Sequence, residues 1–229
     1  MMQHDSVRAK KSFGQHFLND DAIAAAIADA LPKSDVKMDT LEIGPGMGVL
    51  TKFLLERSDL NLTAVELDKE SVVYLGQHYP DFKNKIIEGD FLQLNLKSIF
   101  PQPFYLVGNF PYNISSQILF HCLDYRPVVK EICGMFQKEV AERITAQVGD
   151  DAYGRLAVIV QATAQARIVL DLPARAFTPP PKVASAVVHL VPHTERLEPG
   201  LLKALEKTTQ AAFGQRRKML RSSLKTLGG

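Results

Sequence analysis

TLEIGPGMG, residues 40–48, is the stretch that decides the fold of this chain. It begins as a short β-type run, continues into three glycines at alternate positions, and is followed by a helical pattern that starts near Val49. Glycines at the end of a strand permit a tight turn and let a ligand approach the backbone. The stretch therefore predicts a ligand-binding loop between a strand and a helix of an α/β sheet.

The same alternation of β-type runs and helical patterns continues to about Gly149. It favours a mostly parallel sheet with helices on both faces. Strands are expected at 62–65, 85–87, 104–107 and 131–136, and helices at 49–57, 69–78, 115–123 and 138–147. A further helix is expected at 156–164, and strands at 167–172 and 184–191. We expect one α/β domain over residues 1–192 and a basic, helical segment over 193–229, with a break near Gly214.

Carboxylates follow the next two strands of the predicted sheet, Glu66 after the second and Asp90 after the third. Because the carboxyl ends of parallel strands share one edge, we expect both acids and the glycine loop in one line, where open α/β folds bind ligands. A carboxylate at Glu66 would accept hydrogen bonds from both ribose hydroxyls of a nucleoside, and Asp90 is placed to accept from an adenine amine. Helix capping explains either acid alone better than it explains both.

An oxidoreductase that binds a dinucleotide is the rival interpretation of the glycine loop. Its fingerprint requires glycine or alanine three residues after the second glycine. Counted from Gly46, that position is Val49 in this chain. The spacing therefore favours a different nucleoside cofactor.

The sequence Asn109-Phe110-Pro111-Tyr112 directly follows the fourth strand, at the same edge. An adenine N6 amine is a poor nucleophile because its lone pair is delocalised into the ring. The Asn109 side-chain oxygen and the Phe110 carbonyl would each accept one N6–H and aim that lone pair at the methyl group of a sulfonium cofactor. Pro111 would fix the turn, and Tyr112 would stack on the base, a contact worth roughly 1–3 kcal/mol. We therefore expect catalysis mainly by positioning, with a proline turn and a buried tyrosine as the alternative.

Phe177 precedes three consecutive prolines, residues 179–181. A loop of this kind is stiff, so whatever it carries is held in place. Phe177 is therefore a candidate for the second wall of the base slot, opposite Tyr112, where it would hold a base that has rotated out of its stack. An ordinary core phenylalanine is the equally weighted alternative.

Composition and charge narrow the class of protein. Hydrophobic residues make up 46% and charged residues 23%, as in soluble globular proteins, and no apolar run has the length of a membrane span. Cys122 and Cys133 have neither metal-binding nor redox spacing, so we expect a cytoplasmic protein without a metal, and nothing demands an oligomer. Basic residues gather near both ends, which suggests contact with a polyanion, although charge alone favours a solvated basic surface.

Five segments carry a resemblance to a known family. They are KSFGQHFL at 11–18, EIGPG at 42–46, EGD at 88–90, NFPYNIS at 109–115 and FTPPPKV at 177–183. In order and spacing they resemble the rRNA adenine N6-dimethyltransferases, above all those of the bacterial small ribosomal subunit, over nearly the whole chain. The resemblance implies a Rossmann-like class I methyltransferase fold with a seven-stranded, mostly parallel sheet and a small C-terminal helical domain.

The resemblance also implies the substrates and the site. S-adenosyl-L-methionine would be the cofactor, and two adjacent adenosines in the 3′-terminal hairpin of 16S rRNA would be dimethylated in the immature 30S subunit. The cofactor would meet Gln15, His16, Leu18, Gly44, Gly46, Glu66, Asp90 and Asn109. Gly44 would contact its methionine part, Glu66 its ribose and Asp90 its adenine. Phosphates of the RNA would meet Arg216, Arg217, Lys218 and Arg221.

Two departures from the family pattern stand out. The family commonly has leucine where this chain has Phe110, and little effect is expected because only the carbonyl is needed. Family members also continue for some tens of residues beyond the basic segment, whereas this chain ends at Gly229, so the C-terminal domain is expected to be incomplete. Three alternatives stay open: a 23S rRNA methyltransferase of the antibiotic-resistance type, a pre-30S assembly factor with incidental methylation, and a DNA adenine methyltransferase.

Overall fold

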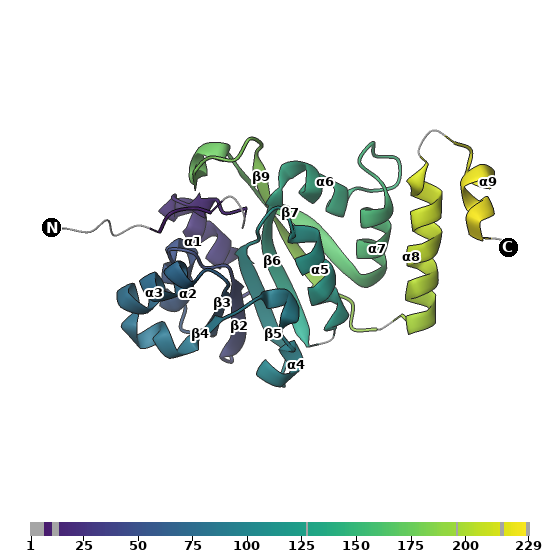
Figure 1. The fold of residues 1–229 in the computed structure, drawn as a ribbon. Helices are drawn as coiled ribbons and strands as arrows, with labels where there is room; N and C mark the ends of the chain where they lie inside the picture. The colour runs from purple at the N-terminus through teal and green to yellow at the C-terminus, as the bar shows by residue number, and fades with distance from the viewer. Residues whose placement is uncertain (1–6, 11–13, 127, 196, 216–217, 228–229) are drawn as a thin grey trace.

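The protein is described here by a computed structural model that covers residues 7–10, 14–126, 128–195, 197–215 and 218–227 (Figure 1). Its centre is a seven-stranded sheet with the strand order β4-β3-β2-β5-β6-β9-β7. The strands are β2 Met38–Ile43, β3 Leu60–Glu66, β4 Ile86–Glu88, β5 Phe104–Asn109, β6 Val129–Gln137, β7 Ala164–Leu172 and β9 Ser185–Pro192. Only β9, between β6 and β7, runs antiparallel to its neighbours in this sheet. The predicted mostly parallel, seven-stranded sheet is therefore confirmed.

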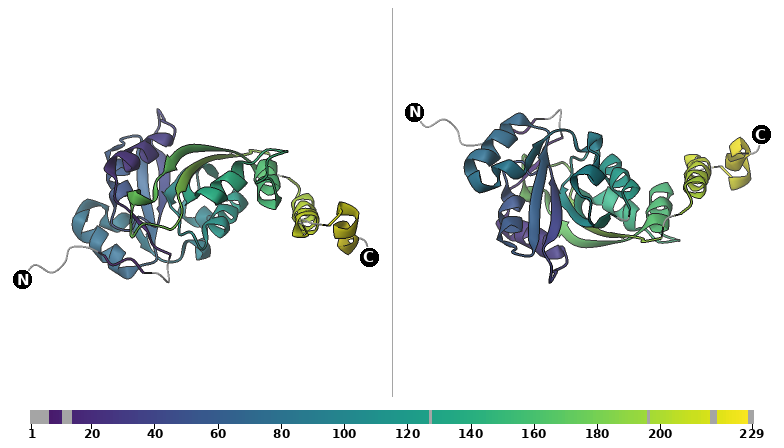
Figure 2. Two further views of the ribbon diagram at one scale, coloured as in Figure 1. Left: turned by 90° about the horizontal axis from the view of Figure 1, so that it is seen from above. Right: turned by 90° about the horizontal axis from the view of Figure 1, so that it is seen from below.

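Helices cover both faces of the sheet, as the alternating sequence pattern predicted (Figures 1 and 2). Alternate residues of β5 show the division. Leu106 packs into the core cluster that includes α5, and Val107 packs into the cluster that includes α1 and α2. The helices are α1 Asp21–Ala30, α2 Val49–Glu56, α3 Lys69–His78, α4 Leu96–Ile99, α5 Ser115–Asp124, α6 Lys138–Thr145, α7 Arg155–Thr163, α8 Pro199–Gly214 and α9 Leu220–Ser223. Short 3₁₀ helices lie at Pro80–Lys85, Phe91–Gln93, Ala174–Ala176 and Leu224–Leu227.

The sequence did not predict the N-terminal part of the fold. Helix α1 begins after Asp20, whose side chain accepts a hydrogen bond from the N–H of Ile23. Ahead of it, the short strand β1, Phe17–Leu18, pairs antiparallel with β8, Phe177–Thr178, in a second, two-stranded sheet. This pairing brings the N-terminal segment and the proline-rich loop together, although about 160 residues separate them in the chain.

The C-terminal segment lies at one end of the molecule. Helix α8 packs against α7, and α9 packs against α8. Figures 1 and 2 show α8 and α9 beyond α7, away from α3. The expected break after Gly214 is present, because α8 ends there. Among the described residues, no helix combines the length and the apolar character that crossing a membrane requires.

Candidate active site

The loop between β2 and α2 adopts a backbone that glycine accepts most readily. Gly44, Gly46 and Gly48 have φ values of +65°, +58° and +82°, in the left-handed region. A Cβ at Gly46 would lie 2.8 Å from the ring of Phe17, and one at Gly48 would lie 2.6 Å from the ring of Tyr79. The loop therefore presents its backbone at the carboxyl end of β2, as the glycine pattern predicted.

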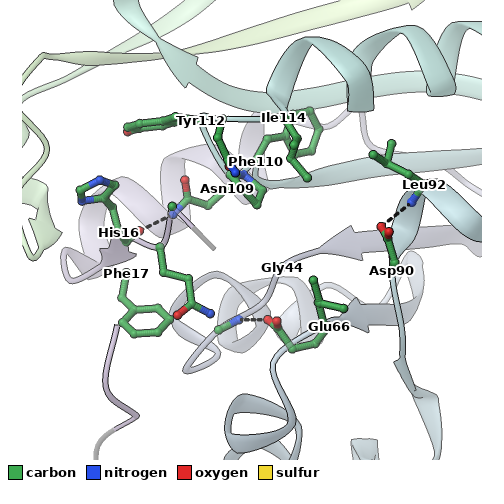
Figure 3. Close-up of a pocket in the computed structure, with 16 residues that line it drawn as sticks. His16, Phe17, Gly44, Glu66, Asp90, Leu92, Asn109, Phe110, Tyr112 and Ile114 are labelled. Carbon is green, nitrogen blue, oxygen red and sulfur yellow. Dashed lines mark hydrogen bonds between the residues drawn. The ribbon is translucent and has the colours of Figure 1, made fainter. Parts of the chain in front are cut away.

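Glu66 is the buried carboxylate at the end of β3. One of its oxygens accepts a hydrogen bond from the N–H of Gly46 at 3.0 Å (Figure 3). The other accepts from the N–H of Asp68 at 2.9 Å. Burial raises the pKa of the Glu66 carboxyl. A carboxylate oxygen has more than one lone pair, so each oxygen keeps the capacity for a further hydrogen bond. Glu66 thus fixes the glycine loop and still offers acceptors to a ligand.

Asp90 caps a helix and faces a cavity at the same time. Its Oδ1 atom accepts a hydrogen bond from the N–H of Leu92 at 3.0 Å, at the start of the 3₁₀ helix Phe91–Gln93 (Figure 3). Helix capping, the alternative that the sequence left open, is therefore present for this acid. It does not consume the second carboxylate oxygen, because Oδ1 makes the capping bond.

Asn109 is held by the backbone of the N-terminal segment. Its Nδ2 group donates a hydrogen bond to the carbonyl of His16 at 2.7 Å. This bond uses the amide nitrogen and leaves the amide oxygen to accept other hydrogen bonds. Figure 3 shows that oxygen on the side of Tyr112. The side chain therefore presents a fixed hydrogen-bond acceptor at the end of β5.

The side chain of Phe110 lies in the core, whereas its backbone lies at the site. The ring is fully buried and packs edge-on against Phe136, with 5.3 Å between the ring centroids. A Cβ at Gly134 would lie 2.3 Å from this ring, so glycine there leaves the space that the ring fills. The predicted use of the backbone, and not of the ring, fits this arrangement.

Tyr112 is fixed at the rim by two contacts. Its hydroxyl shares a hydrogen bond with the hydroxyl of Ser185. Its ring stacks with the imidazole of His16, with 5.4 Å between the centroids and 26° between the ring planes. His16 Nδ1 in turn lies 2.7 Å from the carbonyl oxygen of Pro179. The N-terminal segment and the proline-rich loop therefore meet at this tyrosine.

These groups surround a cavity of about 280 Å³ at the carboxyl ends of β2, β3 and β5, here called the strand-end cavity. The predicted residues that line it are Gln15, His16, Gly44, Gly46, Glu66, Asp90, Asn109, Phe110, Pro111 and Tyr112. The structure thus gathers most of the expected site into one space. Apolar walls that the sequence did not predict come from Phe17, Leu67, Leu92 and Ile114. Leu67 directly follows Glu66, and Leu92 comes two residues after Asp90. This closeness to the strand-end acids is the feature of the sequence that could have predicted them as lining residues.

Leu18 and Phe177 lie elsewhere. They are 5% and 1% exposed, stand opposite each other in the β1–β8 pair, and belong to the core beside α1. Leu18 borders a small neighbouring cavity of about 20 Å³ instead of the larger one. In this structure the ring that stacks with Tyr112 belongs to His16, while the β1–β8 pairing turns Phe177 inward. A contact between Phe177 and a target base remains a prediction.

Two of the expected RNA-contacting residues, Lys218 and Arg221, lie within the described part of the chain. Lys218 and Arg221 are exposed, just before and within α9, at the end of the molecule away from α3 (Figure 1). Arg216 and Arg217 lie outside the described residues. The structure therefore leaves the phosphate contacts as a prediction.

The sheet order, the glycine loop and the strand-end acids define the class of protein, a class I methyltransferase. The family model for ribosomal RNA adenine dimethylases matches residues 6–229, and the chain belongs to this family.

Curated relatives agree with this assignment. The ribosomal RNA small subunit methyltransferase A of Parabacteroides distasonis is 50% identical over 224 residues, which is 97% of this chain and 83% of that protein. Its counterpart in Caulobacter vibrioides is 49% identical over 225 residues, 96% of this chain and 86% of that protein.

Solved structures show the same fold. The 23S rRNA methyltransferase ErmE superposes with a TM-score of 0.74 at 30% identity, covering 92% of this chain and 84% of that one. A dimethyladenosine transferase from Plasmodium falciparum gives a TM-score of 0.73 at 31% identity, covering 92% of this chain and 75% of that one.

Proposed function

We propose that this enzyme transfers methyl groups from S-adenosyl-L-methionine to the N6 amines of two adjacent adenosines in the 3′-terminal hairpin of 16S rRNA, in immature 30S subunits in the cytoplasm. The observation that carries the proposal is the Asn109 amide, whose nitrogen is bound to the His16 carbonyl at 2.7 Å, beside the cavity that Glu66 and Asp90 line. The names of the relatives, small subunit methyltransferases, support the choice of 16S rRNA.

The residues of the strand-end cavity fit S-adenosylmethionine. Gly44 and Gly46 present backbone without a side chain to the cavity, and Glu66 keeps lone pairs for two ribose hydroxyls. Asp90 has a second oxygen for the adenine amine, and Leu67 and Leu92 supply apolar surface for the adenine ring. The volume of about 280 Å³ is close to the lower end of the usual range of about 300–1,000 Å³.

The protein contributes mainly position and hydrogen-bond acceptors. When bound, the cofactor supplies an electrophilic methyl group on its sulfonium. The Asn109 oxygen and the Phe110 carbonyl each accept a hydrogen bond from one N6–H group of adenine. These bonds draw the nitrogen lone pair out of the ring and direct it at the methyl group. After one methylation a single N–H remains, so one acceptor suffices to orient the amine again. The proton of the methylated amine is acidic and leaves to water, and holding both reactants in line supplies most of the rate.

Tyr112 holds the target base in this scheme. Its ring offers an aromatic face, and the hydrogen bond to Ser185 fixes the orientation of that face. Stacking of a base on an aromatic side chain contributes roughly 1–3 kcal/mol. Pro111 fixes the turn between the acceptors and the stacking ring.

Methyl transfer from labelled S-adenosylmethionine to 30S particles that lack the modification tests the proposal. We expect dimethyladenosine at two adjacent positions near the 3′ end of 16S rRNA, located by mass spectrometry of nuclease fragments. A second candidate, methylation of 23S rRNA, is favoured by the structural likeness to ErmE. Product in 23S rRNA alone, or in duplex DNA alone, overturns the choice of 16S rRNA.

A further inference from the structure

The N-terminal segment forms one wall of the strand-end cavity. Gln15 and His16 line this cavity, although neither belongs to the main sheet. On one side the segment is held by the β1–β8 pair. On the other side it is held by a carboxylate that the proposed chemistry does not use, Asp68, at the start of α3.

Asp68 receives hydrogen bonds from two residues of the distant N-terminal segment. Lys10 Nζ lies 2.6 Å from Oδ1, and Gln15 Nε2 lies 3.4 Å from Oδ2. Near α3, the N–H of Glu70 donates to Oδ1 at 3.2 Å. The Asp68 side chain is only 1% exposed, whereas that of Lys10 is 33% exposed. Burial by itself would raise the pKa of Asp68, but the hydrogen bonds from Lys10, Gln15 and Glu70 outweigh burial and lower it.

These contacts continue into the residues of the cavity. The backbone N–H of Lys10 donates to Gln15 Oε1 at 2.9 Å, so the Gln15 amide is bound at both ends. The backbone N–H of Asp68 donates to Glu66 at 2.9 Å. Asp68 thus contacts both sides of the cavity, Gln15 through its carboxylate and the ribose-binding candidate Glu66 through its backbone N–H.

We propose that Asp68 is a positioning residue for the cofactor, which holds Gln15 and the N-terminal segment against the strand-end cavity through its ion pair with Lys10. The inference rests on the proposed function, because the ligand of the cavity is taken to be S-adenosylmethionine. The Asp68 side chain lies outside the lining of the cavity and acts through Gln15. Its loss therefore weakens cofactor binding while the acceptors at Asn109 and Phe110 stay in place.

A purely structural role makes a different prediction. As the N-cap of α3, Asp68 would support the helix, and its replacement would lower stability without a specific effect on the cofactor. Asp68→Asn separates the two roles, since asparagine is also a good N-cap but cannot form the ion pair. Lys10→Met removes the same ion pair, together with a second one of 3.0 Å between Lys10 and Glu70, without touching the cap. Lys52→Met is the matched control, because Lys52 forms an ion pair of 2.8 Å with Asp21 between α1 and α2.

Calorimetric titration of the free protein with S-adenosylmethionine tests the inference. We expect Asp68→Asn and Lys10→Met each to raise Kd about tenfold, as for a lost hydrogen bond to a charged group. The double variant should bind about as weakly as Lys10→Met, because that substitution already removes the ion pair with Asp68. Lys52→Met should bind as the unaltered protein does. Methylation assays should show the change in the KM for the cofactor, with kcat kept within about threefold.

Wild-type affinity in Lys10→Met overturns the inference, even if Asp68→Asn fails to fold. A fall in kcat without a change in Kd also overturns it, since Asp68 would then act on the chemical step. Because the titration needs no RNA, a protein that binds S-adenosylmethionine but methylates another nucleic acid refutes the proposed substrate and leaves this inference intact. Absence of binding by the unaltered protein refutes the proposed cofactor instead.

Discussion

The strand-end cavity and the C-terminal segment hold their functional groups in opposite ways. In the cavity, Asn109 and Glu66 are fixed by hydrogen bonds to backbone atoms from distant parts of the chain. In the C-terminal segment, Lys218 and Arg221 are exposed. A fixed acceptor acts on one atom of its ligand, whereas an exposed cation attracts any nearby phosphate. Substitutions in the cavity should therefore affect single steps sharply, and those in the C-terminal segment should weaken RNA binding gradually.

Asn109→Ala should have the largest effect, because it removes an acceptor whose orientation the structure fixes. We expect kcat to fall by roughly 10²-fold or more, by analogy with the loss of one preorganised hydrogen-bond group from an active site. Binding of the 30S particle should be unchanged. Single-turnover transfer of labelled methyl groups measures the first quantity, and particle co-sedimentation measures the second.

Asn95→Ala is the matched control for this experiment. Asn95 is exposed and makes no capping hydrogen bond with its side chain at the start of α4. Methylation at the unaltered rate by Asn109→Ala would contradict the catalytic role of the amide. Loss of particle binding in the same variant would show that the cavity and the RNA-binding surface do not act separately, and would contradict the contrast between these two regions.

Gly134→Ala tests whether the floor of the cavity is as rigid as its packing indicates. The added Cβ would lie 2.3 Å from the ring of Phe110, which is itself packed against Phe136. Overpacking of this kind typically costs 1–3 kcal/mol, so we expect the free energy of unfolding to fall by about 2 kcal/mol. Denaturant unfolding followed by circular dichroism measures it.

Phe110→Leu provides the matching test of the same contact. Leucine leaves room for the Cβ, so the double variant Gly134→Ala/Phe110→Leu should be more stable than Gly134→Ala alone. Phe110→Leu by itself should keep most of the activity, because the backbone carbonyl is the acceptor. If Phe110→Leu lost activity as severely as Asn109→Ala, the phenyl ring would have a role in catalysis that the proposal denies.

The parts of the fold that local patterns determine were predictable. Strands β2, β3 and β5 and the loop at Gly44 follow from short apolar runs and punctuating glycines. Because parallel strands end at one edge, the placement of Glu66 and Asn109 beside that loop followed without any knowledge of distant contacts. The order of the strands beyond β5 was not predicted, since it depends on which apolar faces meet.

The parts that depend on long-range contacts were missed or misplaced. The pairing of β1 with β8 joins two-residue strands, which leave no periodic signal in the sequence. That pairing buries Phe177 and brings His16 beside Tyr112, and a local interpretation of the sequence could predict neither contact. Asp68 was also missed, because its importance comes from Lys10, which is 58 residues away.

Glu42→Gln should change the pH dependence of stability, because Glu42 is a buried carboxyl in β2. Glu42 is 1% exposed and accepts a hydrogen bond from Thr51 at 2.7 Å. Burial raises its pKa from 4.5 to about 8. The folded state then binds this proton more tightly than the unfolded state, so the protein loses stability as the pH rises from about 4.5 to about 8. Glutamine cannot ionise and should remove this loss.

Unfolding at pH 5 and pH 8.5 measures the difference. We expect Glu42→Gln to be more stable than the unaltered protein at the higher pH and to differ little from it at the lower one. Glu56→Gln, an exposed position on α2, serves as the control and should show no such trend. Equal pH dependence in Glu42→Gln and the unaltered protein would show that Glu42 is ionised in the fold.

Lys218→Ala and Arg221→Ala should have the smallest effects and complete the comparison. Each removes one exposed cation, so RNA binding should weaken modestly and the slope of log K against log salt should become shallower by about 1 per lost phosphate contact. The rate at saturating RNA should not change, because neither side chain reaches the strand-end cavity. Lys97→Ala, an exposed position on α4, is the control. An unchanged slope in both variants would remove these residues from the interface, and a fall in kcat would mean that the two regions act together during the transfer.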